Sequence, residues 1–275
     1  MLQRLWLSPR AQRIAERFDG DAAKGVRTLA RQLLADSGIS GPPFFPDLLA
    51  QHCGIREIRP MDMRQDGLLV NEGTAWTIYV NQRYPVRSGQ WNAICAHELG
   101  HALLLRHGNG ERRAVAWTRE EEELCDLAAR ELLLPLRAIH PMLNDGRPDE
   151  AFTIESLKWF VDTFRTPPRM TAARLVESGP WRGLAAQWTP RAGGLGGVRL
   201  AWWYGDPPPA LAPLRRGLAP AELFGETNRI DHAWNADMPT LGLEALHGRK
   251  GWVFVRSGPF EENGARYVIS LVRFE

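Results

Sequence analysis

The segment ICAHELGHALLLRH, residues 94–107, holds two histidines four positions apart, with a glutamate directly after the first. Residues four apart lie on the same face of a helix, so His97 and His101 can present both imidazoles to one metal ion. Glu98 is turned away from that face and can reach a water molecule on the ion, where a carboxylate acts as general base. The pattern therefore predicts one Zn²⁺ ion at a catalytic site, where zinc lowers the pKa of water to about 7.

The residues around this motif predict a buried helix from about Gly89 to His107. Most of the neighbouring positions are apolar, including Ile94, Leu99 and the run ALLL that follows the second histidine. Ionisable side chains on a buried helix are costly unless a partner compensates them, and metal coordination does so. Gly100 weakens the helix by roughly 1 kcal/mol relative to alanine, which suggests that another backbone packs closely there.

A third protein ligand is needed, and His107 is the first candidate. It lies six positions after His101, the spacing of the third histidine in the long metzincin motif. That motif also requires a glycine three positions after the second histidine, where the chain turns back. This sequence has Leu104 there, so we expect the helix to continue and His107 to face away from the site.

The second candidate lies in the acidic run Glu120–Glu123, which opens another predicted helix. Glu122 and Asp126 form an E-x-x-x-D pattern, in which a helix glutamate completes the zinc ligands and the aspartate holds a ligand histidine in place. Glu121 shares a helix face with apolar residues as well, so periodicity alone leaves Glu121 and Glu122 both open. The remaining acids are expected to be a solvated run that stabilises the helix N-terminus.

Two blocks together, AHELGHALL and EELCDLAARELLLP, resemble the ImmA/IrrE family of zinc metallopeptidases. The second block commonly reads E-x-E-A-N-x-F-A-A-x-L-L-M-P in that family, where Glu122 matches the first glutamate and Asp126 the Asn/Asp position. Leu124 stands where a second glutamate is usual, so the resemblance assigns the ligand role to Glu122. The resemblance covers roughly residues 40–140.

The resemblance implies a zincin-like α+β core in which the strand Ala75–Asn81 is the edge beside which an extended substrate lies. Family members are typically site-specific endopeptidases that cut a helix-turn-helix repressor and thereby release genes for DNA-damage response, mobile-element transfer or phage defence. Some carry a C-terminal sensory domain, GAF-like in several cases, and some respond to single-stranded DNA. This implies a helix-turn-helix repressor as substrate and single-stranded DNA as a candidate activator.

The chain pattern predicts an α+β protein with four segments. Residues 1–40 are helical, 41–150 form the zincin-like core with its flanking helices, and 151–185 form a helical hairpin. The hairpin resembles a helix-turn-helix, but its Pro-Pro pair suits a DNA-reading turn poorly, so a hairpin packed on the peptidase core is favoured. Strands dominate residues 186–275, which we expect to be a mainly β or α+β sensory domain.

Composition limits the compartment and the partners. The chain has 275 residues, a net charge of +2 and no unbroken apolar stretch long enough to span a bilayer. Its three cysteines are an odd number at unrelated spacings, and its N-terminus lacks a long apolar segment, so a cytoplasmic protein is expected. The charge argues neither for nor against nucleic acid, although strand aromatics such as Trp202 and Tyr204, interleaved with arginines, could stack on a single strand.

Other side chains near the motif suggest additional roles. Cys95 and Cys125 could supply a fourth zinc ligand that acts as a switch, since a thiolate can occupy the open position of a catalytic zinc. Their apolar neighbours favour simple packing as small hydrophobic residues instead. His140 follows the second zinc helix and could assist an oxyanion, although the sequence does not place it.

Two rival functions remain. One is a zinc-containing DNA-binding transcriptional regulator whose metal site is structural; the intact Glu98 argues against it, because a structural site needs no base and usually closes with a fourth ligand. The other is a sensory module that has lost peptidase activity, which the sequence does not exclude.

Overall fold

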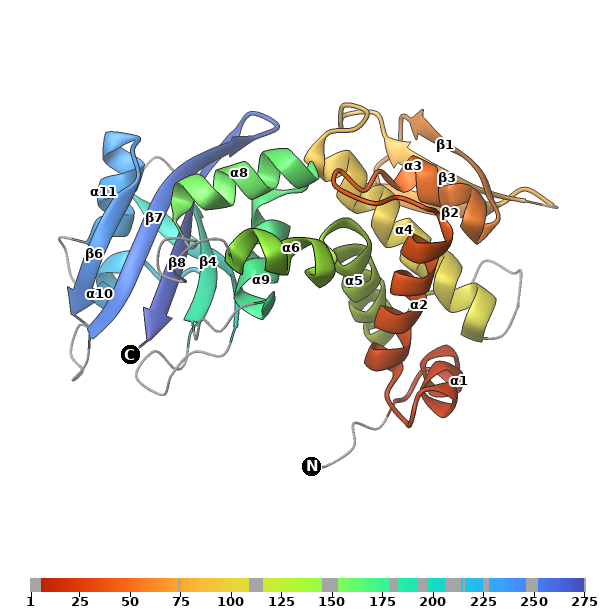
Figure 1. The fold of residues 1–275 in the computed structure, drawn as a ribbon. Coiled ribbons are helices and arrows are strands. Elements are labelled where there is room, and N and C mark those ends of the chain that lie inside the picture. The colour runs from red at the N-terminus through yellow and green to blue at the C-terminus, as the bar shows by residue number, and fades with distance from the viewer. Residues whose placement is uncertain are drawn as a thin grey trace. The chain divides into compact units, whose positions relative to one another are not determined.

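A computed structural model describes residues 6–73, 75–108, 116–144, 153–178, 183–191, 197–205, 214, 216–224, 228–245 and 252–274 (Figure 1). Its helices and two β-sheets confirm the expected α+β class. Within the described residues, no helix is both long enough and hydrophobic enough to cross a membrane.

By their contacts, the residues divide into two compact units: unit 1 comprises Met1–Ala138 and Asp162–Pro167, and unit 2 comprises Ile139–Val161 and Pro168–Glu275. The four segments expected from the sequence stay a prediction, and their boundary at residues 150 and 151 lies outside the described residues.

Unit 1 begins with short helices that have clear sequence signals. Ser8 and Asp21 cap the first two helices through their side-chain oxygens, which accept hydrogen bonds from backbone N–H groups of the first turn. A short α-helix that begins at Pro46 continues into a 3₁₀ helix, which Gly54 ends in the left-handed conformation. The bounds are α1 Pro9–Arg17, α2 Ala22–Asp36, α3 Pro46–Ala50 and the 3₁₀ helix Gln51–Cys53.

The sheet of unit 1 has three strands, β1 Ile55–Met61, β2 Gly67–Asn71 and β3 Trp76–Asn81, in the order β1-β3-β2. The expectation that the strand 75–81 forms the edge is therefore wrong, because β3 is the central strand. It pairs parallel with β1 and antiparallel with β2. The antiparallel pairing of β2 with β3 joins strands that are close in sequence, whereas the pairing of β1 with β3 depends on packing over a longer stretch of chain.

Two longer helices carry the candidate site, α4 Gly89–Gly108 and α5 Arg119–Leu133. They pack against each other, and α4 also packs under β2 and β3. The side chains of Ile78 and Val80 on β3 are fully buried. The extent of α4 agrees within one residue with the helix predicted from Gly89 to His107.

Unit 2 contains an antiparallel sheet of five strands in the order β5-β4-β8-β7-β6. The strand bounds are β4 Gly183–Pro190, β5 Val198–Tyr204, β6 Thr240–Ala245, β7 Trp252–Glu262 and β8 Ala265–Phe274. The helix bounds are α6 Leu136–Asn144, α8 Ile154–Phe164, α9 Pro168–Ser178, α10 Pro220–Phe224 and α11 Arg229–Ala236. The division between the units falls within α6 and within α8.

Helices cover both faces of this sheet. On one face, side chains of β4, β5, β7 and β8 form a core with residues of α10 and α11, such as Phe224 and Ile230. On the other face, α9 packs on β4 and β8, and Ile154 of α8 contacts Gly258. Helix α9 and the start of α8 therefore pack on the sheet of unit 2, so the expectation that the hairpin packs on the peptidase core is wrong for this part. It holds for residues 162–167, which belong to unit 1: the Asn92 side chain donates to the Arg165 carbonyl oxygen at 2.9 Å, and the ring centroids of Phe164 and Phe44 lie 6.2 Å apart.

The core of unit 2 is centred on Trp188, whose side chain is almost completely buried. Its indole N–H donates to Ser270 Oγ at 3.0 Å, and Ser270 Oγ lies 2.7 Å from Ser257 Oγ. This chain joins the strands β4, β8 and β7 through the middle of the sheet and satisfies three buried polar groups.

Replacing Trp188 by alanine should destabilise unit 2 by about 3–5 kcal/mol, because a large cavity would form in its core. Trp188→Phe, which mainly removes the hydrogen bond to Ser270, should cost less, and Trp159→Ala, at a half-exposed position, should change stability by less than about 0.5 kcal/mol. Urea unfolding followed by circular dichroism would measure these differences. Equal midpoints for the two alanine variants would contradict the assignment of Trp188 to the core.

Candidate metal centre

The helix α4 presents the three residues of the motif together. One potential ligand atom from each of His97, Glu98 and His101 lies within 4.8 Å of the other two, and no other such group of three acidic, cysteine or histidine residues occurs in the described ranges. The two imidazole rings meet edge to face, with centroids 4.7 Å apart. His101 and Glu98 are buried and His97 is partly exposed, so the group lies at the margin of the protein interior.

The helix α5 brings Glu122 to both histidines. Its Oε2 atom lies 3.0 Å from Nε2 of His97 and 3.7 Å from Nε2 of His101. Ligands at about 2.0–2.1 Å from a tetrahedral zinc ion are about 3.4 Å apart, so these two separations bracket the expected value. Two imidazoles and a carboxylate also suit zinc chemically. We prefer Glu122 over Glu98 as the third ligand, since the Glu98 carboxylate accepts a hydrogen bond from the backbone of Leu69.

Glu121, the other glutamate left open by periodicity, is engaged elsewhere. Its Oε2 atom accepts from the Thr118 backbone N–H at 2.9 Å, and its own N–H donates to Thr118 Oγ1, a capping box at the start of α5. Its Oε1 atom accepts from Ser8 Oγ at 2.6 Å and from the Arg10 guanidinium at 2.8 Å. The sequence Thr118-Arg119-Glu120-Glu121 carried this signal, because it has the S/T-x-x-E form of a capping box.

His97 is held from both sides by carboxylates. Its Nδ1 atom lies 2.8 Å from Asp126 Oδ1, one helical turn after Glu122. Burial acts to lower the pKa of His97, but the hydrogen bond and charge of Asp126, with the charges of Glu98 and Glu122, raise it above the usual value. A carboxylate on Nδ1 fixes the ring orientation and leaves Nε2 for a metal, as in many zinc sites.

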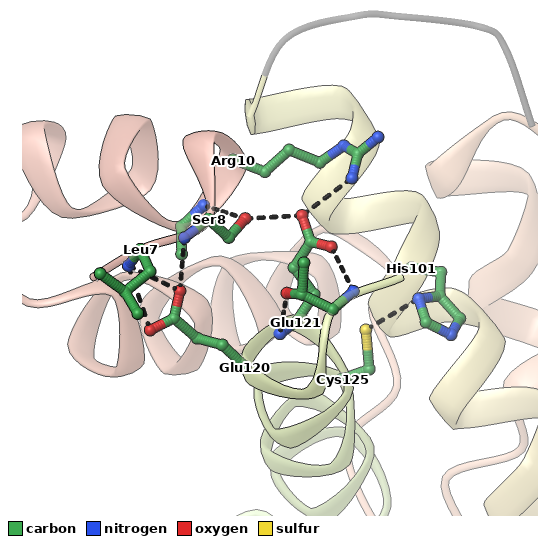
Figure 2. Close-up of polar contacts among 9 residues, drawn as sticks. Leu7, Ser8, Arg10, His101, Glu120, Glu121 and Cys125 are labelled. Carbon is green, nitrogen blue, oxygen red and sulfur yellow. Dashed lines mark hydrogen bonds and ion pairs between the residues drawn. The ribbon is translucent and has the colours of Figure 1, made fainter. Parts of the chain in front are cut away.

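His101 is fixed by neutral groups instead. Its Nδ1 atom lies 3.1 Å from Sγ of Cys125, as Figure 2 shows, and its ring stacks on Trp117 with centroids 4.0 Å apart and planes 29° apart. Burial and the charge of His97 lower the pKa of His101 to about 3, so the ring is neutral and able to bind a metal at neutral pH. Neither contact could be read from the sequence.

Glu98 is buried against strand β2. Burial, with the charge of Glu122, raises the pKa of its carboxyl group to about 7, although the charge of His97 and the Leu69 N–H act in the opposite direction. A Cβ atom at Gly67 would lie 2.7 Å from Glu98 Oε1, so this glycine leaves the room that the carboxylate occupies. Strand β2 therefore lies directly beside the candidate base.

The two metal-site helices touch at Gly100. A Cβ atom there would lie 2.9 Å from Cα and 3.0 Å from the carbonyl oxygen of Cys125. The expectation that another backbone packs closely at Gly100 is thus confirmed. On α4 the contact falls within the turn that carries His97 and His101. On α5 it falls within the turn that carries Glu122 and Asp126, so it determines how closely these side chains approach one another.

The remaining candidates are not members of this group, although one of them contacts it. The sulfur of Cys125 contacts the His101 nitrogen opposite to the one that faces Glu122, and Cys95 is fully buried and outside the three-residue group. His107 contacts Arg17 on α1 at 3.3 Å, in line with its expected orientation away from the site. His140 belongs to unit 2, where its Nε2 atom lies 3.1 Å from the carbonyl oxygen of Ser178.

The comparison with known families agrees with this geometry. Residues 51–174 match the model of the M78 peptidase family, described as the IrrE N-terminal-like domain. This part of the chain is therefore an IrrE N-terminal-like domain, which confirms the resemblance to the ImmA/IrrE family, and it contains all the candidate ligands.

Structural comparison supports the fold. A solved structure described as a Mycobacterium tuberculosis transcriptional regulator is similar, with a TM-score of 0.57 and 13% sequence identity over 90% of this chain and 87% of that chain. No curated protein matches the sequence. At this identity the similarity concerns the fold alone, and the domain match indicates a metallopeptidase family.

Gly100→Ala should lower both stability and zinc affinity. Alanine would gain about 1 kcal/mol of helix propensity, but its Cβ atom would collide with the backbone of α5, and overpacking of this kind costs about 1–3 kcal/mol. We expect a net loss of stability and weaker zinc binding, measured by thermal unfolding and by competition with a chromophoric chelator. Gly41→Ala is the control, since its Cβ atom would meet nothing within 4 Å. Unchanged zinc affinity in Gly100→Ala would contradict the role of the helix contact.

Glu98→Gln should stabilise the metal-free protein at high pH. The folded-state pKa of about 7 lies above the ordinary value of 4.5, so between these pH values the folded protein holds a proton that the unfolded chain has lost. The wild type therefore loses stability as the pH rises from about 4.5 through 7. The stability advantage of Glu98→Gln should grow by about 2–3 kcal/mol between pH 5 and pH 8. Urea unfolding in the presence of a chelator measures it, and an advantage independent of pH would contradict the raised pKa.

Proposed function

We propose that this protein is a zinc-dependent, site-specific endopeptidase. The observation that carries the proposal is the convergence of His97 and His101 with the Glu122 carboxylate beside a buried Glu98. The three ligands would hold zinc, and a buried carboxylate, that of Glu98, lies beside them, which a purely structural zinc site does not need. Asp126 would orient His97, and Cys125, whose sulfur lies 3.1 Å from Nδ1 of His101, would support that ring.

Each side chain has a specific part in peptide hydrolysis. When bound, zinc would polarise the scissile carbonyl and lower the pKa of a water molecule. Glu98 would accept the proton of the attacking water and return it to the leaving amine, which suits a carboxyl group with a pKa of about 7. Hydrogen bonding of Asp126 to His97 would keep the imidazole in the tautomer that offers Nε2.

The substrate would lie along β2. This strand pairs with β3 on one side only and forms an edge of the three-stranded sheet. Its Leu69 N–H reaches Glu98, so the outer side of the strand lies next to the candidate base. An extended peptide that adds to this edge would bring a peptide bond towards the metal centre.

The proposed substrate is a helix-turn-helix repressor, cleaved in the cytoplasm during a stress, DNA-damage or phage-defence response. The IrrE N-terminal-like match and the resemblance to the ImmA/IrrE family support it. The three cysteines are free, which suits a reducing compartment.

Unit 2 would receive the activating signal as a GAF-like sensory domain, since it has its own sheet and core. Single-stranded DNA is the proposed activator. The rings of Trp202 and Tyr204 are stacked with centroids 6.4 Å apart, and the guanidinium of Arg169 lies 5.5 Å from the centroid of the Trp202 ring. Such an arrangement of aromatic rings and cations can hold bases.

A DNA-binding regulator is less well supported. The helix α9 would be the DNA-reading helix of the hairpin, yet it buries residues on most of its surface. Arg174, one of its arginines, is fully buried and pairs with Glu177 at 2.9 Å, so it does not reach a phosphate backbone.

Glu98→Gln should slow cleavage strongly while keeping zinc. Because it removes the base and none of the three proposed ligands, we expect cleavage about 10²–10⁴-fold slower and one zinc ion per chain. Glu122→Gln should instead weaken zinc binding. Helix-turn-helix repressors of the same genome would be the candidate substrates, each co-expressed with every variant, with and without single-stranded DNA. Mass spectrometry would locate the cut and metal analysis would count the zinc.

Cleavage by Glu98→Gln at the wild-type rate would contradict the role of Glu98 as base. A wild-type protein that binds zinc and cuts nothing, with or without DNA, would support a sensory module without peptidase activity. A wild-type protein that binds no zinc would overturn the metal centre itself.

A further inference from the structure

The segment before α1 is bound to the N-terminus of α5, as Figure 2 shows. The Glu120 carboxylate accepts from the backbone N–H groups of Leu7, at 3.0 Å, and Ser8, at 2.8 Å. Glu121, the next residue, accepts from the Ser8 hydroxyl and the Arg10 guanidinium. Both Glu121 and Arg10 are buried, so the pair is shielded from water and is stronger than an ion pair on the surface. These contacts hold the turn of α5 that carries Glu122.

Arg10 also contacts Trp117, whose ring packs on the candidate ligand His101. Its guanidinium carbon lies 4.8 Å from the centroid of the Trp117 ring, and Trp117 stacks on His101. Trp117 precedes α5 and belongs to no helix, so its ring depends on these neighbours for its position. One arginine therefore contacts both the cap of the helix that carries Glu122 and the ring that lies on His101.

The ring orientation of His101 depends more on such contacts than that of His97. The Nδ1 atom of His97 has a carboxylate partner in Asp126, whereas that of His101 has the sulfur of Cys125, a much weaker hydrogen-bond partner. A weak partner on the ring edge leaves the ring plane less well determined. The stack with Trp117 supplies the missing constraint, because a flat ring 4.0 Å away opposes rotation of the imidazole.

We propose that Arg10 is a positioning residue of the metal centre, acting on His101 through Trp117 and on Glu122 through Glu121. The inference rests on the proposed zinc site and extends it to helix α1, which lies before the matched range 51–174. On this basis the zinc site depends on a part of the chain outside the IrrE N-terminal-like domain.

The test is the zinc affinity of the full-length chain, measured on metal-free protein by competition with a chromophoric chelator. Arg10→Met should weaken zinc binding about ten-fold or more, as loss of a residue that orients a zinc ligand does. Trp117→Leu should weaken it similarly, and Trp117→Phe, which keeps a flat ring, should recover part of the affinity. The visible absorption spectrum of the Co²⁺-substituted protein should change in Arg10→Met, since it reports ligand geometry.

The matched control is Arg31→Met. Arg31 on α2 pairs at 2.8 Å with Glu131, a buried glutamate near the C-terminal end of α5. The substitution therefore removes an ion pair of the same length from α5, away from the metal centre. It should lower stability without changing zinc affinity or the cobalt spectrum. Trp117→Leu decides the matter if Arg10→Met does not fold, because Trp117 is only partly buried.

Equal affinities in Arg10→Met, Trp117→Leu and wild type would overturn the proposal and leave the zinc site intact. Equal losses in Arg10→Met and Arg31→Met would assign Arg10 a purely structural role and would also overturn it. Absence of zinc binding by the wild type would overturn the proposed function and this inference together.

Discussion

The contact between α4 and α5 at Gly100 and Cys125 is the constraint on which the candidate site depends. The two helices come so close that a single added carbon at Gly100 would overlap the backbone of α5. Side chains of moderate length therefore meet across the contact, His97 and His101 from one helix and Glu122 from the other. A helix pair separated by larger side chains would place the same residues too far apart to share one ion, because zinc ligands must lie about 3.4 Å from one another.

Bringing these groups together in a protein interior has an electrostatic cost, and the local partners show how it is offset. Glu98 is buried enough to raise its pKa to about 7, and the N–H of Leu69 is its hydrogen-bond donor. His97 is paired with two carboxylates, and its pKa rises in response. His101 remains neutral, with a sulfur atom and an indole ring as neighbours. The three carboxyl groups of Glu98, Glu122 and Asp126 outnumber the one imidazole that is readily protonated, His97, so the site has an excess of negative charge, which favours a dication.

Elements outside the two helices complete the site. Strand β2 places Gly67 and Leu69 against Glu98, and the start of the chain places Ser8 and Arg10 against Glu121. The candidate metal centre thus depends on contacts between residues that are far apart in sequence. Unit 2 has a separate core around Trp188, so its folding rests on a different set of contacts.

The sequence by itself determined the features that depend on local periodicity: the extent of α4, the shared face of His97 and His101, and the α+β class. The different surroundings of Glu121 and Glu122 required the structure, because periodicity lets both point inward from one helix. Only the folded chain shows Glu121 bound to Ser8 and Arg10, and Glu122 beside the two histidines. Strand order also lay beyond the sequence, since a hairpin is a local signal but the parallel pairing of β1 with β3 is not. The contacts of Trp117 and Cys125 with His101 also required the tertiary structure, because sequence spacing does not specify the distances between side chains of different segments.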